Sequence, residues 1–259
     1  MTLGPPDMPA SALKPEPSAS RKEPVVSIVI PVYNEAKIAG PAVDELTRKL
    51  DEQGWDYEVI LAENGSTDGT LAVLSELAAR HPRVRFIHED QANYGRALKR
   101  GILEARGRFV ICDEIDLCDV GFYQRALPLL ETEAHAADLV VGSKAMEGAD
   151  DARPLVRRLA TRIINFLLRV ATGFRGSDTH GLKAFRRDKL TDVARACVVE
   201  RDLFASELVI RAGRMGRDVR EIPIALHEKR PPSVQLFRRV PRVLKGLVHL
   251  AWVIRFKRR

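Results

Sequence analysis

The chain has few cysteines and no long apolar run. Its 259 residues include only Cys112, Cys118 and Cys197, which form neither a CxxC pair nor an even disulfide framework. Unpaired thiols are typical of a reducing compartment, so we expect a cytoplasmic protein. No apolar stretch approaches the roughly 18–20 residues of a spanning helix, and no secretory leader is visible near the N-terminus. We therefore expect a chain that is not exported and does not cross a membrane, although it can lie on one.

Two further absences narrow the function classes. Aromatic residues make up 6% of the chain and no recognised nucleic-acid-binding motif is present, so nucleic acid ranks last among partners for the net charge of +7. No GxGxxG follows the first apolar segment, which argues against an NAD-type Rossmann enzyme. With 45% hydrophobic and 30% charged residues, the composition is that of an ordinary globular protein.

Short apolar segments alternate with helical patterns along the first half of the chain. After a tail over residues 1–24, rich in Pro, Ala and Ser, strands are expected at 25–31, 57–62, 84–88, 108–112, 139–143 and 219–226. Helices are expected between them, including one with Leu71, Leu74, Leu77 and Ala78 facing inward and Thr67 or Asp68 as its cap. The alternation predicts an α/β fold with a mainly parallel sheet flanked by helices.

The stretch 108–119 joins a buried-strand pattern to a group of acids. Its apolar residues 109–112 are followed by four carboxylates: Asp113, Glu114, Asp116 and Asp119. Ligands of open α/β sheets collect outside the carboxyl ends of the strands, and clustered carboxylates repel one another unless a cation holds them. Oxygen ligands suit Mg²⁺ or Mn²⁺, which would bridge to substrate phosphates. On these residues alone, a cation site and a solvated acidic loop are equally good interpretations.

Two basic amphipathic helices are expected in the second half. One, after residue 150, gathers its apolar side chains on one stripe: Leu155, Val156, Leu159, Ile163, Phe166, Leu167 and Val170. It either packs on the core or faces anionic lipid or a lipid-linked substrate. The other, over residues 236–259, carries Trp252 near its end and either docks on the sheet or lies on an anionic membrane surface. A third helix, near 202–214, includes Glu207, a carboxylate that needs a partner or a ligand if it is buried.

Short motifs occur in an order that resembles family 2 glycosyltransferases of the GT-A fold. They are PVYNE at 31–35, ENGSTDGT at 63–70, GRAL at 95–98, DEID at 113–116 and VGSK at 141–144. Further motifs look like the polyprenyl-phosphate branch, which dolichyl-phosphate mannose synthase and its bacterial relatives define: DTHG at 178–181, FR at 185–186, EL at 207–208 and EIP at 221–223. The resemblance covers roughly residues 25–242, and its strength lies in the order of the motifs rather than in any one of them.

The resemblance implies roles for individual residues. A nucleotide-sugar donor would be contacted by Pro31, Tyr33, Glu35, Glu63, Asn64 and Asp68. On the phosphate and acceptor side, the implied substrate-binding residues are Lys144, His180, Arg230 and Ser233. Glu114 and Asp116 would be the D-x-D equivalent that holds Mg²⁺ or Mn²⁺ on the donor diphosphate, with Asp113 as an extra acid. The catalytic candidates are Asp116 and Asp119, one of which would accept a proton if the acceptor is a hydroxyl.

The function implied is inverting transfer of a hexose from a nucleotide sugar, of the GDP-mannose or UDP-glucose type, to a polyprenyl phosphate at the cytoplasmic face of a membrane. A GT-A domain would occupy residues 25–235, and residues 236–259 would form a basic helix at the membrane surface. Relatives often append transmembrane helices, so the chain is expected either to use a membrane-protein partner or to act on a soluble acceptor.

Two departures from the family pattern keep other functions open. The chain has Glu63-Asn64 where relatives usually have Asp-Asp, and Glu114 where they have the first Asp of Asp-Ala-Asp. The alternatives are a soluble transferase acting on a hydroxyl acceptor and a nucleotide-sugar-binding protein without turnover.

Overall fold

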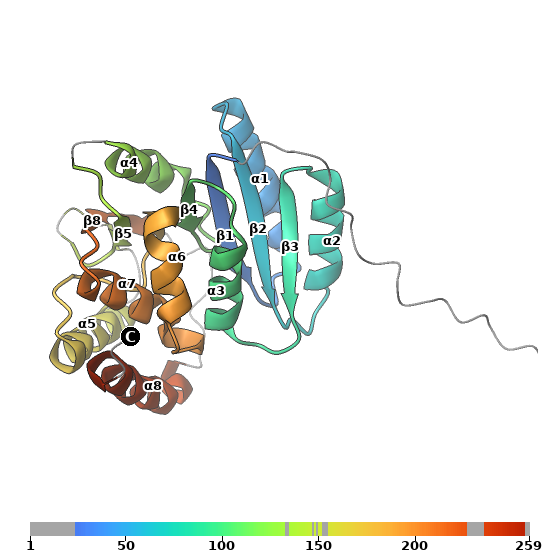
Figure 1. The fold of residues 1–259 in the computed structure, drawn as a ribbon. Coiled ribbons are helices and arrows are strands. Elements are labelled where there is room, and N and C mark those ends of the chain that lie inside the picture. Colours follow the sequence, from blue (N-terminus) through green and yellow to red (C-terminus); the bar gives the residue numbers. More distant parts are fainter. Residues whose placement is uncertain are drawn as a thin grey trace, which may run out of the picture.

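A seven-stranded sheet forms the centre of the molecule (Figure 1). The structure, a computed structural model, describes residues 24–132, 135–146, 148, 150–151, 155–226 and 236–256. The strands are β1 (Val26–Val32), β2 (Tyr57–Asn64), β3 (Val84–Glu89), β4 (Phe109–Cys112), β5 (Leu139–Ser143), β7 (Lys183–Arg186) and β8 (Val219–Pro223). Their order is β3-β2-β1-β4-β7-β5-β8, and only β7 runs antiparallel to its neighbours. The predicted mainly parallel α/β sheet is confirmed.

Helices cover both faces of this sheet. One face carries α1 (Ala39–Glu52), α2 (Thr70–Arg80) and α4 (Val120–Glu131); the other carries α3 (Tyr94–Glu104), α6 (Arg187–Ala196) and α7 (Phe204–Arg214). The alternation of side chains along a strand accounts for the two layers. In β1, Ile28 and Ile30 pack with the first set of helices, whereas Val29 packs with the second. Each layer therefore has its own apolar core, and the strands are apolar on both faces.

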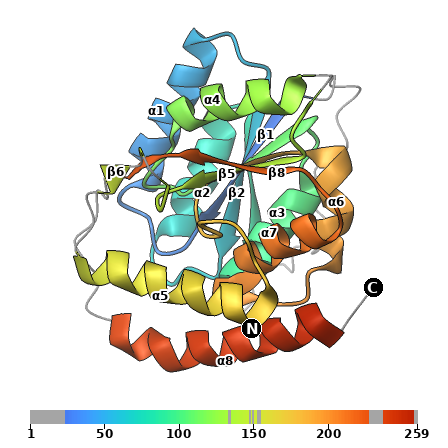
Figure 2. The same cartoon turned by 90° about the vertical axis from the view of Figure 1, so that its left-hand side faces the viewer.

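The helices α5 (Leu155–Thr172) and α8 (Leu236–Phe256) lie side by side at one end of the molecule (Figures 1 and 2). With α7 and the 3₁₀ turn η1 (Arg201–Leu203) they enclose a third apolar cluster, to which α8 contributes Leu247, Leu250, Val253 and Ile254. Helix α8 thus docks on other helices rather than on the sheet. No helix among the described residues is long and apolar enough to span a membrane.

Several local predictions were wrong. Leu71 is 40% exposed rather than inward-facing. Gly69 is the residue directly before α2, but Asp68, one of the two predicted caps, does accept from the Thr70 amide at the helix start, over 3.0 Å. The predicted last strand is interrupted after β8, and β9 (Ala225–Leu226) pairs instead with β6 (Asp150–Asp151). Strand β7 and helix α6 had no counterpart in the sequence prediction. The antiparallel pairing of β7 inserts it between β4 and β5, next to the acidic stretch.

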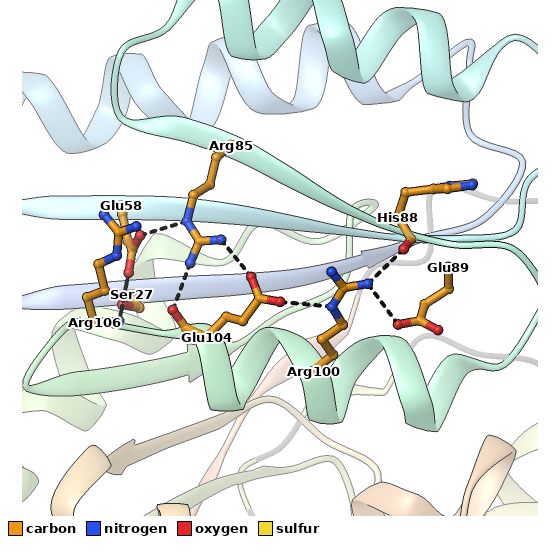
Figure 3. Close-up of polar contacts among 8 residues, drawn as sticks. All are labelled: Ser27, Glu58, Arg85, His88, Glu89, Arg100, Glu104 and Arg106. Atoms are coloured by element: carbon orange, nitrogen blue, oxygen red, sulfur yellow. Dashed lines mark hydrogen bonds and ion pairs between the residues drawn. The ribbon is translucent and has the colours of Figure 1, made fainter. Parts of the chain in front are cut away.

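Polar side chains brace the edge of the sheet where the parallel strands begin (Figure 3). The Ser27 hydroxyl donates to Glu58 Oε1 over 2.7 Å and accepts from the Gly107 amide over 2.8 Å. Arg85 then links Glu58 to Glu104, with distances of 3.1 and 3.2 Å. These contacts tie β1, β2 and β3 to the turn between α3 and β4. The carboxyl ends of the same strands, at the opposite edge, are left for the site.

Candidate active site

The loops that follow β1 and β2 are joined by hydrogen bonds. The Asn34 amide donates to Ser66 Oγ over 2.9 Å, and the Thr67 amide donates to Asn34 Oδ1 over 2.8 Å. The Glu35 amide donates to Thr70 Oγ1 over 2.8 Å. Asn34 has φ of 55°, a conformation that asparagine tolerates better than most residues. The two predicted donor-binding motifs therefore form one rigid turn cluster.

The predicted donor-binding residues of this cluster differ in how exposed they are. Tyr33 is 43% exposed, whereas Pro31 is buried within β1. The Asp68 carboxylate accepts from the Thr70 amide over 3.0 Å and from its hydroxyl, and these bonds hold the pKa of Asp68 below its usual value. Tyr33 and Asp68 are both exposed and Glu35 is half-buried, and Asp68 in addition serves the start of α2.

Glu63 and Asn64, which replace the family's paired aspartates, are turned into the protein. Glu63 is fully buried; its Oε1 accepts from the Ser66 amide over 2.6 Å and its Oε2 contacts His88 Nδ1. Burial alone would raise the pKa of Glu63, but the bonds from Ser66 and His88 hold it below its usual value. Asn64 Oδ1 accepts from the Asn93 amide. Both side chains shape the turn, and their contact with a donor remains a prediction.

The N-terminus of α3 connects the turn cluster to the acids after β4. Asn93 contacts Asn64 on one side, and its Oδ1 caps α3 by accepting from the Arg96 amide over 3.1 Å. The next residue, Tyr94, donates its hydroxyl to Glu114 Oε1 over 3.0 Å. A side chain at Gly95 would lie 2.7 Å from the Arg201 amide nitrogen, so only glycine allows η1 to pack this closely.

The three acids at 113–116 are not equivalent. Asp113 is 2% exposed, and one of its oxygens accepts from the Tyr123 hydroxyl and from the Asp119 amide, the latter over 3.0 Å. Burial raises the pKa of Asp113 to about 7. Burial also raises the pKa of Glu114; the Tyr94 bond and the nearby lysines oppose this, and the Asp116 charge adds to it. Asp113 is thus held by the protein, which favours Glu114 as the partner of Asp116.

Asp119, the second catalytic candidate, caps the helix that follows. Its Oδ1 accepts from the Phe122 amide over 3.0 Å at the start of α4. It also lines, with Asp116 and Leu182, a cavity of about 480 Å³ beside the acids. Asp119 therefore both caps α4 and borders the cavity that Asp116 lines, and the catalytic roles of the two acids remain predictions.

Two lysines bring positive charge to the acids from the β5 and β7 side. Lys183 is 3% exposed, donates to the Gly181 carbonyl over 2.7 Å, and lies opposite Cys112 in the sheet register. Burial lowers the pKa of Lys183, while the charges of Cys112, Asp178 and Glu114 oppose the shift. Lys144 Nζ lies 4.0 Å from Asp178 Oδ2, a fully buried oxygen for which the described residues supply no hydrogen bond.

The sequence analysis named Lys144 but missed Lys183, Asp178 and Tyr94 as members of the site. Lys183 is the first residue of β7, whose sequence is KAFR, and no local pattern in the sequence marks it as a member of the site. His180, which was named, donates its amide to Asp178 Oδ1 over 2.9 Å, and burial lowers the pKa of its imidazole to about 4. Two further predicted residues, Arg230 and Ser233, lie outside the described residues.

The acids suit a hard divalent cation that is completed by a substrate. Among the described residues, no three side chains of His, Cys, Asp or Glu are grouped as a ready cation cage. Glu114 and Asp116 offer only oxygen, which is the donor that Mg²⁺ and Mn²⁺ prefer, and Mg²⁺ is commonly held by one or two carboxylates plus substrate phosphates. The residues present therefore fit such an ion bound together with a diphosphate.

Comparison with known families decides the assignment. The sequence profile described as Glycosyl transferase family 2 matches residues 27–193, which include both predicted donor motifs, the acids and the lysines. The chain belongs to glycosyltransferase family 2. It is a glycosyltransferase with the GT-A fold, as the order of its motifs predicted.

Similar family 2 proteins include enzymes named for polyprenyl-phosphate acceptors. The chain is 27% identical to dolichyl-phosphate beta-glucosyltransferase ALG5C of Trichomonas vaginalis, over 83% of this chain and 71% of that protein. It is 34% identical to undecaprenyl-phosphate 4-deoxy-4-formamido-L-arabinose transferase of Pseudomonas fluorescens, over 79% of this chain and 58% of that protein. For glycosyltransferase AglD of Haloferax volcanii the identity is 31%, and the chain spans 35% of its length.

Solved structures share the fold. Glucosyl-3-phosphoglycerate synthase from Mycobacterium tuberculosis, crystallised with Mn²⁺, UDP and glucosyl-3-phosphoglycerate, superposes with a TM-score of 0.62 at 19% identity. The match covers 88% of this chain and 80% of that one. At this identity the likeness shows the GT-A architecture and nothing of the acceptor.

Proposed function

We propose that this family 2 enzyme transfers a hexose from a nucleotide sugar to a polyprenyl phosphate at the surface of an anionic membrane. The observation that carries the proposal is the end of the molecule formed by α5 and α8, where large apolar side chains of both helices face water. The relatives named for dolichyl and undecaprenyl phosphate support the acceptor class.

Helix α5 exposes four large apolar side chains. They are Leu159 (58%), Ile163 (50%), Phe166 (61%) and Val170 (63%). Their spacing of three or four residues puts them on one face of the helix, while Leu168 and its neighbours pack inward. The interpretation of this stripe as a core-packing face is wrong for these four residues.

Helix α8 repeats the arrangement beside α5. Its exposed residues are Leu244 (47%), Val248 (71%), Trp252 (50%) and Phe256 (73%), at every fourth position. We name these eight side chains of α5 and α8 the apolar ridges. The two helices contain four and five Lys or Arg residues, respectively, and no Asp or Glu. Apolar ridges in an all-basic setting complement the interface of an anionic bilayer.

The site suits a phosphate acceptor that attacks without a general base. A phosphate oxygen of the acceptor would form a bond to the anomeric carbon as the bond from that carbon to the donor diphosphate breaks. Attack from the opposite face inverts the configuration, and no proton has to move. Lys144 and Lys183 carry positive charge near the leaving diphosphate, where negative charge builds up in the transition state.

Glu114 and Asp116 are the residues that would hold a divalent ion. When bound, Mg²⁺ or Mn²⁺ would neutralise charge on the donor diphosphate. Tyr94 and the lysines orient and balance the Glu114 carboxylate, and Asp113 fixes the turn from which both acids project. Donors of the GDP-mannose and UDP-glucose types both fit this scheme, because it depends on the diphosphate rather than on the base.

A panel assay tests the proposal. Purified full-length protein would be incubated with GDP- and UDP-sugars, polyprenyl phosphate in anionic vesicles and Mn²⁺, and nucleoside diphosphate release would be measured. We expect Asp116→Asn to lower kcat by about 100-fold and chelation by EDTA to abolish release until Mn²⁺ is restored. Asp56→Asn is the matched control, because Asp56 is exposed at the far edge of the sheet.

The outcomes separate the alternatives. Release that requires the lipid phosphate and Asp116 supports the proposal. Release with a hydroxyl acceptor alone would instead identify a soluble transferase. Equal kcat for the Asp116→Asn and Asp56→Asn variants would contradict the role given to the acids.

A further inference from the structure

The loop 176–178 is held on one side by the helix α5 and on the other by the strand β8. Two side chains of α5 form hydrogen bonds to carbonyl groups of this loop. Asn165 Nδ2 donates to the Ser177 carbonyl over 2.7 Å, and Arg169 donates to the Gly176 carbonyl over 3.1 and 3.2 Å. Asn165 and Arg169 are four residues apart and so share one face of the helix.

Glu221 of β8 accepts hydrogen bonds from the amide groups of the same loop. Its carboxylate accepts from the Ser177 amide over 2.8 and 3.0 Å, from the Ser177 hydroxyl over 2.7 Å and from the Asp178 amide over 3.2 Å. Ser177 Oγ also lies 2.6 Å from Ser143 Oγ, and Ser143 is the residue directly before Lys144 in the chain. The sheet thus fixes one side of the loop, and the position of α5 decides the other.

This loop leads directly into the active site. Asp178 follows Ser177, and its Oδ2 faces Lys144 Nζ at 4.0 Å, too long for a hydrogen bond. Asp178 Oδ2 and Asn165 Oδ1 are both buried, and neither receives a hydrogen bond from the described residues. Within the described part of the chain, the contacts of α5 and β8 with this loop therefore leave these two oxygens without a hydrogen-bond donor.

A different face of α5 carries its apolar ridge. Seating Ile163 and Phe166 in lipid would remove their exposed apolar surface from water and restrain the helix. Because Asn165 lies between these two residues in the chain and points inward, any restraint on the helix reaches the loop through Asn165 and Arg169. No other described helix combines such an exposed apolar face with side chains that hold this loop.

The geometry points to Asn165 and Arg169 as positioning residues. When α5 docks on a membrane, these two side chains set the position of the loop 176–178 and thereby the position of Asp178 relative to Lys144. The inference rests on the proposed function, and it deepens that function: turnover is faster on the membrane because docking sets the loop. It predicts stimulation by lipid even when the acceptor itself needs no membrane.

The test compares one reaction in two formats. Full-length protein would transfer from its nucleotide sugar to a short-chain, water-soluble polyprenyl phosphate, with and without acceptor-free vesicles of phosphatidylcholine and phosphatidylglycerol. We expect vesicles to raise kcat of the unaltered protein by about 10-fold. Arg169→Ala and Asn165→Leu should reduce this ratio to about one while the protein still binds vesicles in a flotation assay. Arg169→Lys, which keeps a donor, should retain part of the stimulation.

A matched control removes a similar contact elsewhere. Arg83 also donates to a backbone carbonyl, that of Trp55, on the surface of the far edge of the sheet, and Arg83→Ala should keep the full ratio. Thermal unfolding would confirm that each variant is folded, and Arg169, the exposed member of the pair, is the milder change.

The results distinguish the two claims. A ratio of one for the unaltered protein bound to vesicles, or an undiminished ratio for folded Arg169→Ala and Asn165→Leu, would overturn the inference and leave the proposed function standing. Absence of transfer in both formats would overturn the proposed function and this inference with it.

Discussion

Gly181 occupies a position where the backbone of the neighbouring strand leaves no room for a side chain. A Cβ atom there would lie 1.6 Å from the Gly142 carbonyl oxygen, which the strand β5 holds in place. We expect Gly181→Ala to lower the free energy of unfolding by about 3 kcal/mol or more, since overpacking against backbone cannot be relieved by a rotamer change. Urea unfolding would measure it.

The control for this prediction is another glycine. A Cβ at Gly213 in α7 would meet nothing within 4 Å, so Gly213→Ala should stabilise the protein by about 0.5–1 kcal/mol. Equal effects of the two substitutions would show that the close approach at Gly181 is not present in solution.

His180 should make stability depend on pH in a defined direction. Its pKa in the folded protein is about 4, below the usual 6.5, because burial disfavours the charged ring. The unfolded chain therefore binds a proton first as pH falls below 6.5, and stability is lost between about pH 6.5 and 4. From pH 7.5 to 5 the unaltered protein should lose about 2 kcal/mol more than His180→Gln. The same loss in both proteins would contradict the assignment.

At the residue scale, the sequence identified side chains that belong to motifs and missed those recruited by packing. Glu114, Asp116 and Lys144 follow apolar strands, so their place at the carboxyl edge could be predicted. Lys183 and Tyr94 reach the same site from β7 and from the start of α3, and no local pattern marks them. The inward turn of Glu63 depends on His88, 25 residues away in the chain, and so could not be predicted from its own motif.

At the scale of the element, α5 and α8 make the most direct prediction. Burial of one phenylalanine side chain in lipid is worth about 2–3 kcal/mol, so Phe166→Ser should weaken binding to anionic vesicles by at least about 10-fold. Trp252→Ser on α8 should have a comparable effect. Vesicle flotation or co-sedimentation at physiological salt would measure both.

Leu71 provides the control for these substitutions. It is 40% exposed, but no other large apolar side chain of α2 is exposed beside it. Helix α2 covers the sheet together with α1 and α4. Leu71→Ser should leave vesicle binding unchanged. Equal loss with Leu71→Ser and Phe166→Ser would indicate non-specific adsorption rather than docking through the apolar ridges.

Elements with a strong period were predictable, and short ones were not. The first four strands followed from short continuous apolar segments, and α5 followed from the helical period of its apolar residues. Strand β7 has only four residues and pairs antiparallel to its neighbours. Its own sequence is too short to show a strand pattern, so the strand is recognised only by its pairing within the sheet. Periodicity also could not say which apolar face of α5 would be buried, because the helix has inward-facing Leu168 beside its exposed stripe.

On the scale of the whole molecule, three apolar clusters hold the helices and the sheet together. Two clusters sandwich the sheet and fix its carboxyl edge, where the acids and lysines meet. The third joins α8 to α5, α7 and η1. Helix η1 also packs on the start of α3, next to Tyr94 and Glu114. The surface proposed to meet the membrane and the surface proposed to meet the donor are thus parts of one packed body.

The central claim is that the acceptor is a polyprenyl phosphate. The most direct test gives the enzyme radiolabelled GDP-mannose or UDP-glucose, a divalent cation, and either a polyprenyl phosphate or the unphosphorylated polyprenol of the same length in anionic vesicles, then measures label in the lipid phase. The account predicts label in lipid with the phosphate and none with the alcohol. Equal labelling of both lipids, or label only in a water-soluble product, would contradict it.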